Sequence, residues 1–145
     1  MFTQPCFIRK NTPELIKKLK EFGYKYNDGG IKSNHIVVFV GCIFDIYPLD
    51  TIKRGFNNCV DCGDNEELFL ALAALRDDTP INSYYWFNDN LFKCEGLEID
   101  RVLKNNTANY LLKCRHVDNS MIISCFKERN VIKATVEEII EHFKK

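Results

Sequence analysis

Two cysteines with the spacing of a redox or zinc motif stand just before an apolar, helix-like segment. Cys59 and Cys62 form a CxxC pair, and the positive end of a helix dipole can lower the pKa of a nearby thiol. A thioredoxin-like site places its cysteines at the start of a helix that follows a parallel strand, whereas these two precede the expected helix cap. A structural zinc needs two more ligands, and the sequence has no second CxxC. We therefore expect no redox centre, no metal and no cofactor.

A single carboxylate interrupts the β-rich segment 35–47. Strict alternation places Asp45 on the face of Ile43 and Tyr47, where a lone carboxylate is usually solvent-facing. A ligand pocket needs a few converging polar groups in an apolar wall. Asp45 and Tyr47, with the acidic loop 61–67 nearby, are the arrangement in this sequence that could provide them. We take Asp45 and Tyr47 as the candidate ligand-binding residues, and no catalytic residue is assigned.

Aromatic side chains are concentrated in segment 84–92, namely at Tyr84, Tyr85, Trp86, Phe87 and Phe92. A base-stacking platform has such rings, but it also needs basic groups that attract phosphate. Residues 45–100 carry four basic and twelve acidic side chains, so we expect no nucleic-acid partner. Core packing explains the rings better. If both faces of this hairpin are hydrophobic, one packs on helices and the other meets a partner chain.

Length and composition predict one domain spanning residues 1–145. The chain has 145 residues, is 46% hydrophobic and carries no net charge, which suits a single substantial core. Seven irregularly spaced cysteines and the absence of a charged, apolar leader predict reduced thiols and a cytoplasmic location. The longest apolar run, 36–46, is about half of the roughly 20 residues that a membrane helix needs. We expect no membrane association.

Three helices are expected from their capping signals. Thr12-Pro13-Glu14 and Gly23 predict a helix over 13–22. Asp64 as cap, with Glu67 three residues later, predicts a helix over 64–76. Residues 68–75 are apolar without a break, so this helix should be covered on every side and lie at the centre of the fold. A third helix is expected from residue 136 to about 144, capped by Thr135 and Glu138.

The strand pattern predicts an α+β protein with an antiparallel or mixed sheet of five to six strands packed against these helices. The turn signal at 27–30 should reverse the chain into the next strand, and Gly41 marks a bend or separates two strands. Hairpins are expected at 83–94, with a three-residue loop, and at 110–127. Segment 48–58 is irregular. The order of elements does not fit a doubly wound sheet.

Three helix starts together resemble those of small uncharacterised proteins carried by bacteriophages and prophages. They are Thr12-Pro13-Glu14-Leu15, Cys62-Gly63-Asp64-Asn65-Glu66-Glu67-Leu68 and Lys133-Ala134-Thr135-Val136-Glu137-Glu138. The resemblance implies an accessory role in the cytoplasm of an infected bacterium. We expect a non-catalytic protein that binds a host protein or a second copy of itself. The alternative is a small-molecule-binding protein or a small enzyme with a pocket near Asp45.

Overall fold

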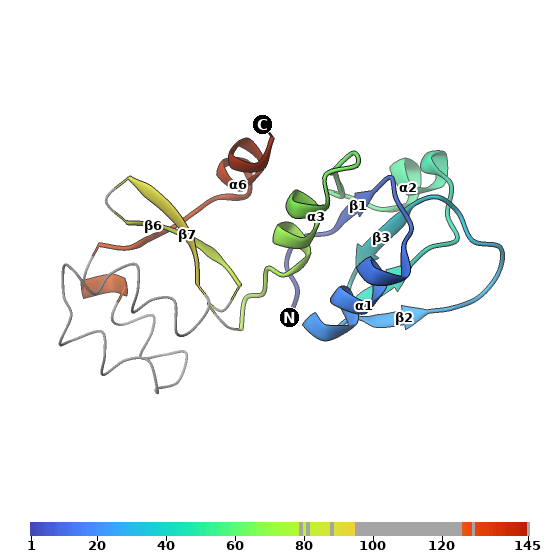
Figure 1. The fold of residues 1–145 in the computed structure, drawn as a ribbon, viewed down its shortest axis with the longest axis horizontal. Helices are drawn as coiled ribbons and strands as arrows, with labels where there is room; N and C mark the ends of the chain where they lie inside the picture. The colour runs from blue at the N-terminus through green and yellow to red at the C-terminus, as the bar shows by residue number, and fades with distance from the viewer. Residues whose placement is uncertain (79, 81, 88, 95–125, 129, 145) are drawn as a thin grey trace. The chain divides into compact units, whose positions relative to one another are not determined.

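The computed structural model describes residues 1–78, 80, 82–87, 89–94, 126–128 and 130–144 (Figure 1). The chain divides into two compact units. The first contains Met1–Leu75 and Ile140–Lys145, and the second contains Arg76–Ile139. Strands and helices occur in both units, which confirms the α+β class. That the whole chain forms one domain stays a prediction.

The first unit is built on a five-stranded mixed sheet in the order β2-β4-β3-β1-β5. Its strands are β1 (Cys6–Ile8), β2 (Lys25–Asn27), β3 (Ile36–Phe39), β4 (Cys42–Phe44) and β5 (Val60–Asp61). Strand β3 pairs antiparallel with both β1 and β4, while the outer pairs β1–β5 and β2–β4 are parallel. The sheet is therefore mixed, which is one of the two arrangements that the sequence left open.

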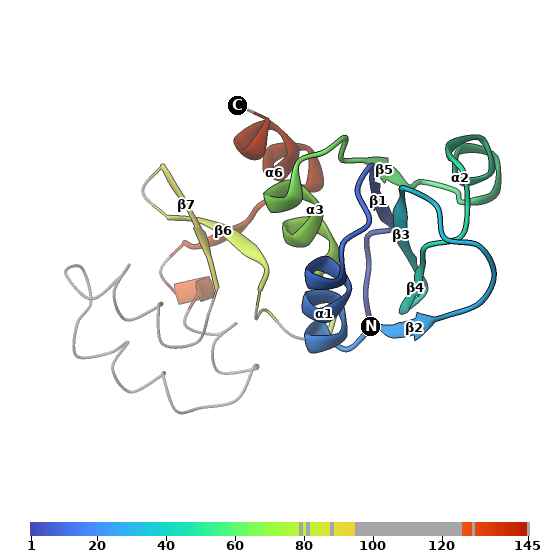
Figure 2. The same cartoon turned by 45° about the vertical axis from the view of Figure 1, so that its right-hand side comes forward.

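Both faces of this sheet are buried. Helices α1 (Pro13–Phe22) and α3 (Glu66–Ala73) lie on one side, and α2 (Leu49–Gly55) lies on the other (Figure 2). On the α2 side, Phe7, Val37 and Ile52 form a buried cluster. The opposite side of the sheet carries Cys6, Ile8, Ile36, Val38 and Ile43, which are at most 1% exposed. Burial on both faces explains why β3 reads as a continuous apolar run.

Helix α1 has the bounds that the sequence predicted. The Thr12 hydroxyl accepts a hydrogen bond from the Leu15 amide, and Gly23 ends the helix with φ of 114°. Leu15 and Leu19 are buried against the sheet. Strands β3 and β4 are joined by Val40 and Gly41, both with positive φ, as in a type I′ hairpin turn. Gly41 thus separates two strands.

Helix α3 is a core helix, but its cap differs from the one predicted. The Asn65 side chain accepts from the Leu68 amide at 3.0 Å and donates to the Phe143 carbonyl at 2.7 Å. An ionised aspartate has no proton to donate to that carbonyl, so Asn65 makes both bonds and Asp64 remains outside the helix. The helix spans eight residues, which is shorter than the predicted 64–76.

Two features of the first unit differ from the sequence prediction. Helix α2 lies in the segment that was judged irregular, and it buries one residue, Ile52, so it has too little apolar periodicity to be recognised. The turn signal at 27–30 does not form a hairpin, because β2 pairs parallel with β4. Strand β3 cannot accept β2, since β1 and β4 already occupy both of its edges.

The second unit contains a three-stranded sheet in the order β7-β6-β8. Its strands are β6 (Tyr84–Phe87), β7 (Asn90–Lys93) and β8 (Ile132–Lys133). Phe87 pairs with Asn90, so the predicted hairpin is present with a connection one residue shorter than expected. Tyr85 packs with Phe92 and Phe126, with ring centroids 4.6 to 6.2 Å apart. These rings form a core, as the sequence indicated.

Helix α6 (Val136–Phe143) begins in the second unit with the predicted capping box. The Thr135 amide donates to Glu138 Oε1 at 2.9 Å, and the Glu138 amide donates to Thr135 Oγ1 at 3.2 Å. The expected hairpin at 110–127 lies outside the described residues, except for its last two positions. Those two belong to a helical turn at 126–128, so they are not in a strand.

The burial of α3 generates a stability prediction. Leu72 is 0% exposed, whereas Leu70 on the same helix is half-buried. Leu72→Ala should lower the free energy of unfolding by about 2–5 kcal/mol, because it leaves a cavity in the core. Leu70→Ala changes the same chemical groups and is the matched control, with a smaller expected loss. Urea unfolding of both variants measures the difference, and equal losses would contradict the central position of Leu72.

Candidate functional site

Asp45 directly follows β4 and lies at the wall of a hollow with a volume of about 670 Å³. Helix α1 supplies one wall, β2 supplies Tyr26, and the loop that leads to β3 supplies a third side. The lining residues are Asn11, Pro13, Ile16, Lys17, Lys20, Tyr26, Lys32, Ser33, Asn34 and Asp45. Polar groups from four separate segments therefore converge on one hollow, in an arrangement typical of ligand pockets.

The Asp45 side chain is 2% exposed, contrary to the solvent-facing position that was expected for a lone carboxylate in this segment. Its Oδ2 accepts from the Tyr26 hydroxyl at 2.7 Å and from Asn11 Nδ2 at 3.4 Å. Its Oδ1 lies 3.4 Å from Lys32 Nζ. A buried carboxylate is costly unless it is paired and hydrogen-bonded, and these three donors meet that requirement.

Lys32 and Tyr26 are coupled to each other as well as to Asp45. Lys32 Nζ donates to the Tyr26 hydroxyl at 2.6 Å and pairs with Asp28. Hydrogen bonds to Asp28 and Tyr26 raise the pKa of Lys32 above its ordinary value. The hydrogen bond from Lys32 lowers the pKa of Tyr26, but the bond to Asp45 and burial outweigh it, and the pKa is raised overall. Both groups therefore keep their protons at neutral pH.

Two hydrogen bonds to the backbone of Ser33 hold the loop that carries Lys32 next to the end of β4. The Ser33 amide donates to the Asp45 carbonyl at 2.7 Å. Asn11 Nδ2 donates to the Ser33 carbonyl at 2.9 Å, so the segment before α1 holds the same loop. The positions of Lys32 and Tyr26 relative to Asp45 thus depend on three segments distant in sequence, and no local motif could have identified them.

Tyr47 lies apart from Asp45. Its ring packs against Phe44 and Phe56, with centroids 5.7 and 5.5 Å away, beside the cluster under α2. The predicted shared face is therefore wrong, because β4 ends at Phe44 and strict alternation does not continue past it. Of the two candidate residues, Asp45 lines the hollow and Tyr47 contributes to the core on the opposite side of the sheet.

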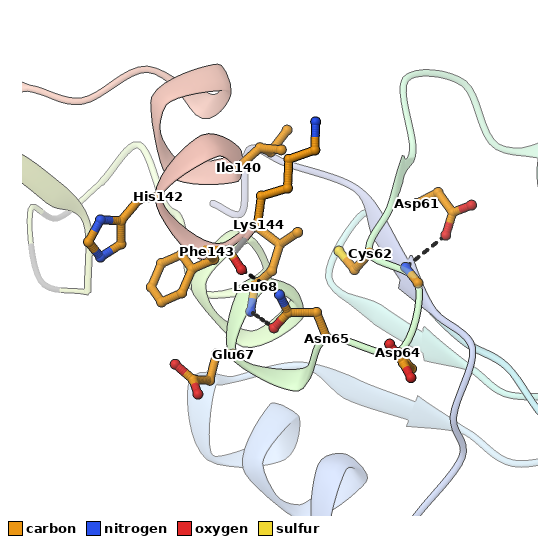
Figure 3. Close-up of a pocket in the computed structure, with 11 residues that line it drawn as sticks. Asp61, Cys62, Asp64, Asn65, Glu67, Leu68, Ile140, His142, Phe143 and Lys144 are labelled. Carbon is orange, nitrogen blue, oxygen red and sulfur yellow. Dashed lines mark hydrogen bonds between the residues drawn. The ribbon is translucent and has the colours of Figure 1, made fainter.

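The acidic loop 61–67 lines a different hollow, of about 710 Å³, together with residues from the end of α6 (Figure 3). Two of its acidic groups, Asp61 and Glu66, have partners. Asp61 pairs with Arg9 at 2.6 Å and accepts from the Gly63 amide at 2.9 Å, while Glu66 lies 3.5 Å from Lys10. These contacts stabilise the turn before α3. Of these two hollows, the loop lines one and Asp45 lines the other.

The CxxC cysteines are poorly placed for thiolate chemistry. Burial, with the nearby Cys62 and Asp61, raises the pKa of the Cys59 thiol to about 12. The Cys62 side chain is buried, so it is poorly accessible to a redox partner. Among the described residues, no group of three His, Cys, Asp or Glu side chains is placed to hold a metal ion. That the pair has no redox or metal role stays a prediction.

Comparison of the chain with models of protein families, with curated proteins and with solved structures yields no match. The resemblance to phage-carried proteins therefore stays a prediction. In the part of the chain that the structure describes, no helix has the length and hydropathy needed to cross a membrane. The candidate site must be judged on its own geometry.

The Asp45 network generates a second prediction about stability. Tyr26→Phe removes the shortest hydrogen bond to a buried carboxylate and should lower the free energy of unfolding by about 1–3 kcal/mol. Tyr47→Phe also removes a phenolic hydroxyl, but on the other side of the sheet. The ring keeps its contacts with Phe44 and Phe56. This substitution should change that free energy by about 0.5 kcal/mol or less. Denaturant unfolding compares the two, and equal effects would contradict the proposed importance of the network.

Thiol alkylation provides a third prediction. A pKa of about 12 leaves roughly one Cys59 thiol in ten thousand ionised at pH 8, against about a quarter of ordinary thiols. The higher nucleophilicity of a more basic thiolate offsets part of this difference, so iodoacetamide should modify Cys59 roughly a hundredfold more slowly than a free cysteine. Peptide mass spectrometry measures the rate at that position. The urea-unfolded chain is the control, and fast modification of the folded protein would refute the assignment.

Proposed function

We propose that this protein binds a small molecule in the hollow beside Asp45. The observation that carries the proposal is the buried Asp45 carboxylate, which holds Tyr26 and Lys32 at the wall of an open hollow. Asp45 is buried while Lys32 stays partly exposed, and burying a carboxylate costs solvation free energy that such a pairing offsets only in part, so stability is a poor reason for placing one here. Preorganised polar groups on a rigid scaffold are what a binding site requires.

The apolar part of the lining supports the same proposal. Pro13 and Ile16 of α1 stand on the wall of the hollow beside the polar groups. Binding sites commonly combine apolar contact area with a few oriented polar groups that determine specificity. A volume of about 670 Å³ is in the range of pockets that accept a metabolite-sized molecule. The geometry thus favours the ligand-binding alternative over the interaction protein that the sequence favoured.

Protein interaction remains a second proposal because three large apolar side chains of the first unit are exposed. Met1 is 74% exposed, Ile31 is 90% exposed, and Val40, at the β3–β4 turn, is 75% exposed. Apolar side chains at such positions can anchor a partner protein. These exposed side chains are the feature that supports binding to a host protein or to a second copy of the chain.

The fourth prediction separates the two functions by capture from a cell extract, analysed for both metabolites and proteins. Wild-type protein should retain a metabolite that Asp45→Asn does not retain. Asp50→Asn makes the same substitution at an exposed position on α2, and this control should behave like wild type. Because the loss of Asp45 affects the fold as well, Asn34→Trp provides an independent test. Asn34 is exposed and lines the hollow, so a tryptophan there should block it.

The outcomes are distinct. Loss of the metabolite with both Asp45→Asn and Asn34→Trp, in proteins that melt cooperatively, supports ligand binding. A stoichiometric protein partner that survives both substitutions, without any retained metabolite, would reverse the preference in favour of protein interaction. Retention of the metabolite by both variants would place its site elsewhere.

A further inference from the structure

The lining of the Asp45 hollow has an excess of positive charge. Three lysines, Lys17, Lys20 and Lys32, face one carboxylate, Asp45. Asp45 is already compensated by Lys32, and Lys32 is paired in addition with Asp28. Within the described residues, neither Lys17 nor Lys20 has an acidic partner within ion-pair distance. Two cationic groups therefore remain for a ligand.

The surface of α1 explains how these lysines reach the hollow. Pro13, Ile16, Lys17 and Lys20 are spaced at i, i+3, i+4 and i+7, so they form one stripe along the helix. All four line the hollow. Leu15 and Leu19 form the buried stripe, whereas Lys18 is exposed and does not line the hollow. The helix thus presents cationic and apolar groups together to the same hollow.

Two of the ammonium groups lie close to the Tyr26 ring. Lys20 Nζ lies 5.2 Å from the centre of the Tyr26 ring, and Lys32 Nζ lies 5.0 Å from it. The side-chain amide of Asn34 has no partner among the described residues, so its two N–H groups can donate to a ligand. Ammonium and amide donors that line the same hollow suit an oxyanion.

We propose that the ligand of this hollow is a small organic oxyanion, a phosphate or a carboxylate, bound by Lys17, Lys20 and Asn34. Asp45 is then a positioning residue that holds Lys32 and Tyr26 and does not itself contact the anion. Pro13 and Ile16 provide the contact area for the organic part of the molecule. This inference rests on the proposed function, because it names the chemical class of the ligand for the same hollow.

The fifth prediction tests the class of ligand with defined probes at constant ionic strength. Inorganic phosphate and succinate represent the two oxyanions, and putrescine represents a cation of similar size. Titration is followed by NMR at the backbone amides of Lys17, Ser33 and Asn34. We expect a saturable shift of these amide resonances with phosphate or succinate. The probe that binds with the higher affinity identifies the class of anion. The Lys17→Gln/Lys20→Gln double variant should bind roughly tenfold or more weakly, because it loses two charged donors.

Lys18→Gln is the matched control, because it removes one charge from the same helix outside the hollow. It should leave the affinity within about twofold of wild type, since an exposed charge at a distance is screened. An equal loss in Lys18→Gln and in single variants of Lys17 or Lys20 would overturn the inference in favour of diffuse attraction. Thermal melts confirm that each variant is folded. All three lysines are exposed, so these substitutions leave the core intact.

Two results would separate this inference from the proposed function. If putrescine shifts the amides of the hollow and neither oxyanion does, the hollow binds ligands but the anionic class is wrong. If no probe shifts them, the anionic class is also refuted, and the extract capture with Asp45→Asn decides independently whether the hollow binds a molecule of another class. Asn34→Trp should abolish any shift that arises from binding in the hollow.

Discussion

Burial of both faces of the five-stranded sheet is the constraint on which the first unit depends. Strand β1 has β3 and β5 as neighbours, so its backbone is paired on both sides. Its side chains are covered by α3 on one face and by the cluster under α2 on the other. A sheet buried in this way admits only apolar side chains or fully paired polar groups. Asp45, which directly follows β4, is such a paired polar group.

The pairing of Asp45 organises the region around it. Its carboxylate accepts hydrogen bonds from Tyr26 of β2 and from Asn11 before α1. It also attracts Lys32 of the loop between β2 and β3. Its own carbonyl accepts from the Ser33 amide, so side chain and backbone hold the same loop. The result is a wall of polar groups beside the stripe of α1 formed by Pro13, Ile16, Lys17 and Lys20. This combination distinguishes the hollow beside Asp45 from the one at loop 61–67, where Asp61 pairs with Arg9 and closes a turn.

The contrast between Asp45 and the CxxC pair shows that residue type is a weaker guide than environment. Cysteines with motif spacing suggested chemistry, but burial raises the Cys59 pKa and suppresses the reactive thiolate. A lone aspartate in a strand suggested a solvated side chain, but donors from three segments surround it. Physical surroundings decide which of these groups can serve a ligand.

Features set within a few residues of one another were determined by the sequence itself. The bounds of α1 and the capping box of Thr135 and Glu138 each depend on backbone preferences and hydrogen bonds within one helical turn. The mixed α+β class followed from the periodicity of the apolar residues. The candidate role of Asp45 was likewise visible as an exception to that periodicity.

Tertiary structure decided everything that joins distant segments. The parallel pairing of β2 with β4 replaced the expected hairpin, because both edges of β3 were occupied. Asn65 became the cap of α3 because it can donate to Phe143, 78 residues away, as well as accept from the helix. The partners of Asp45 lie 13 to 34 residues from it in the chain. Such contacts arise only when packing brings the segments together, and local preferences carry no information about them.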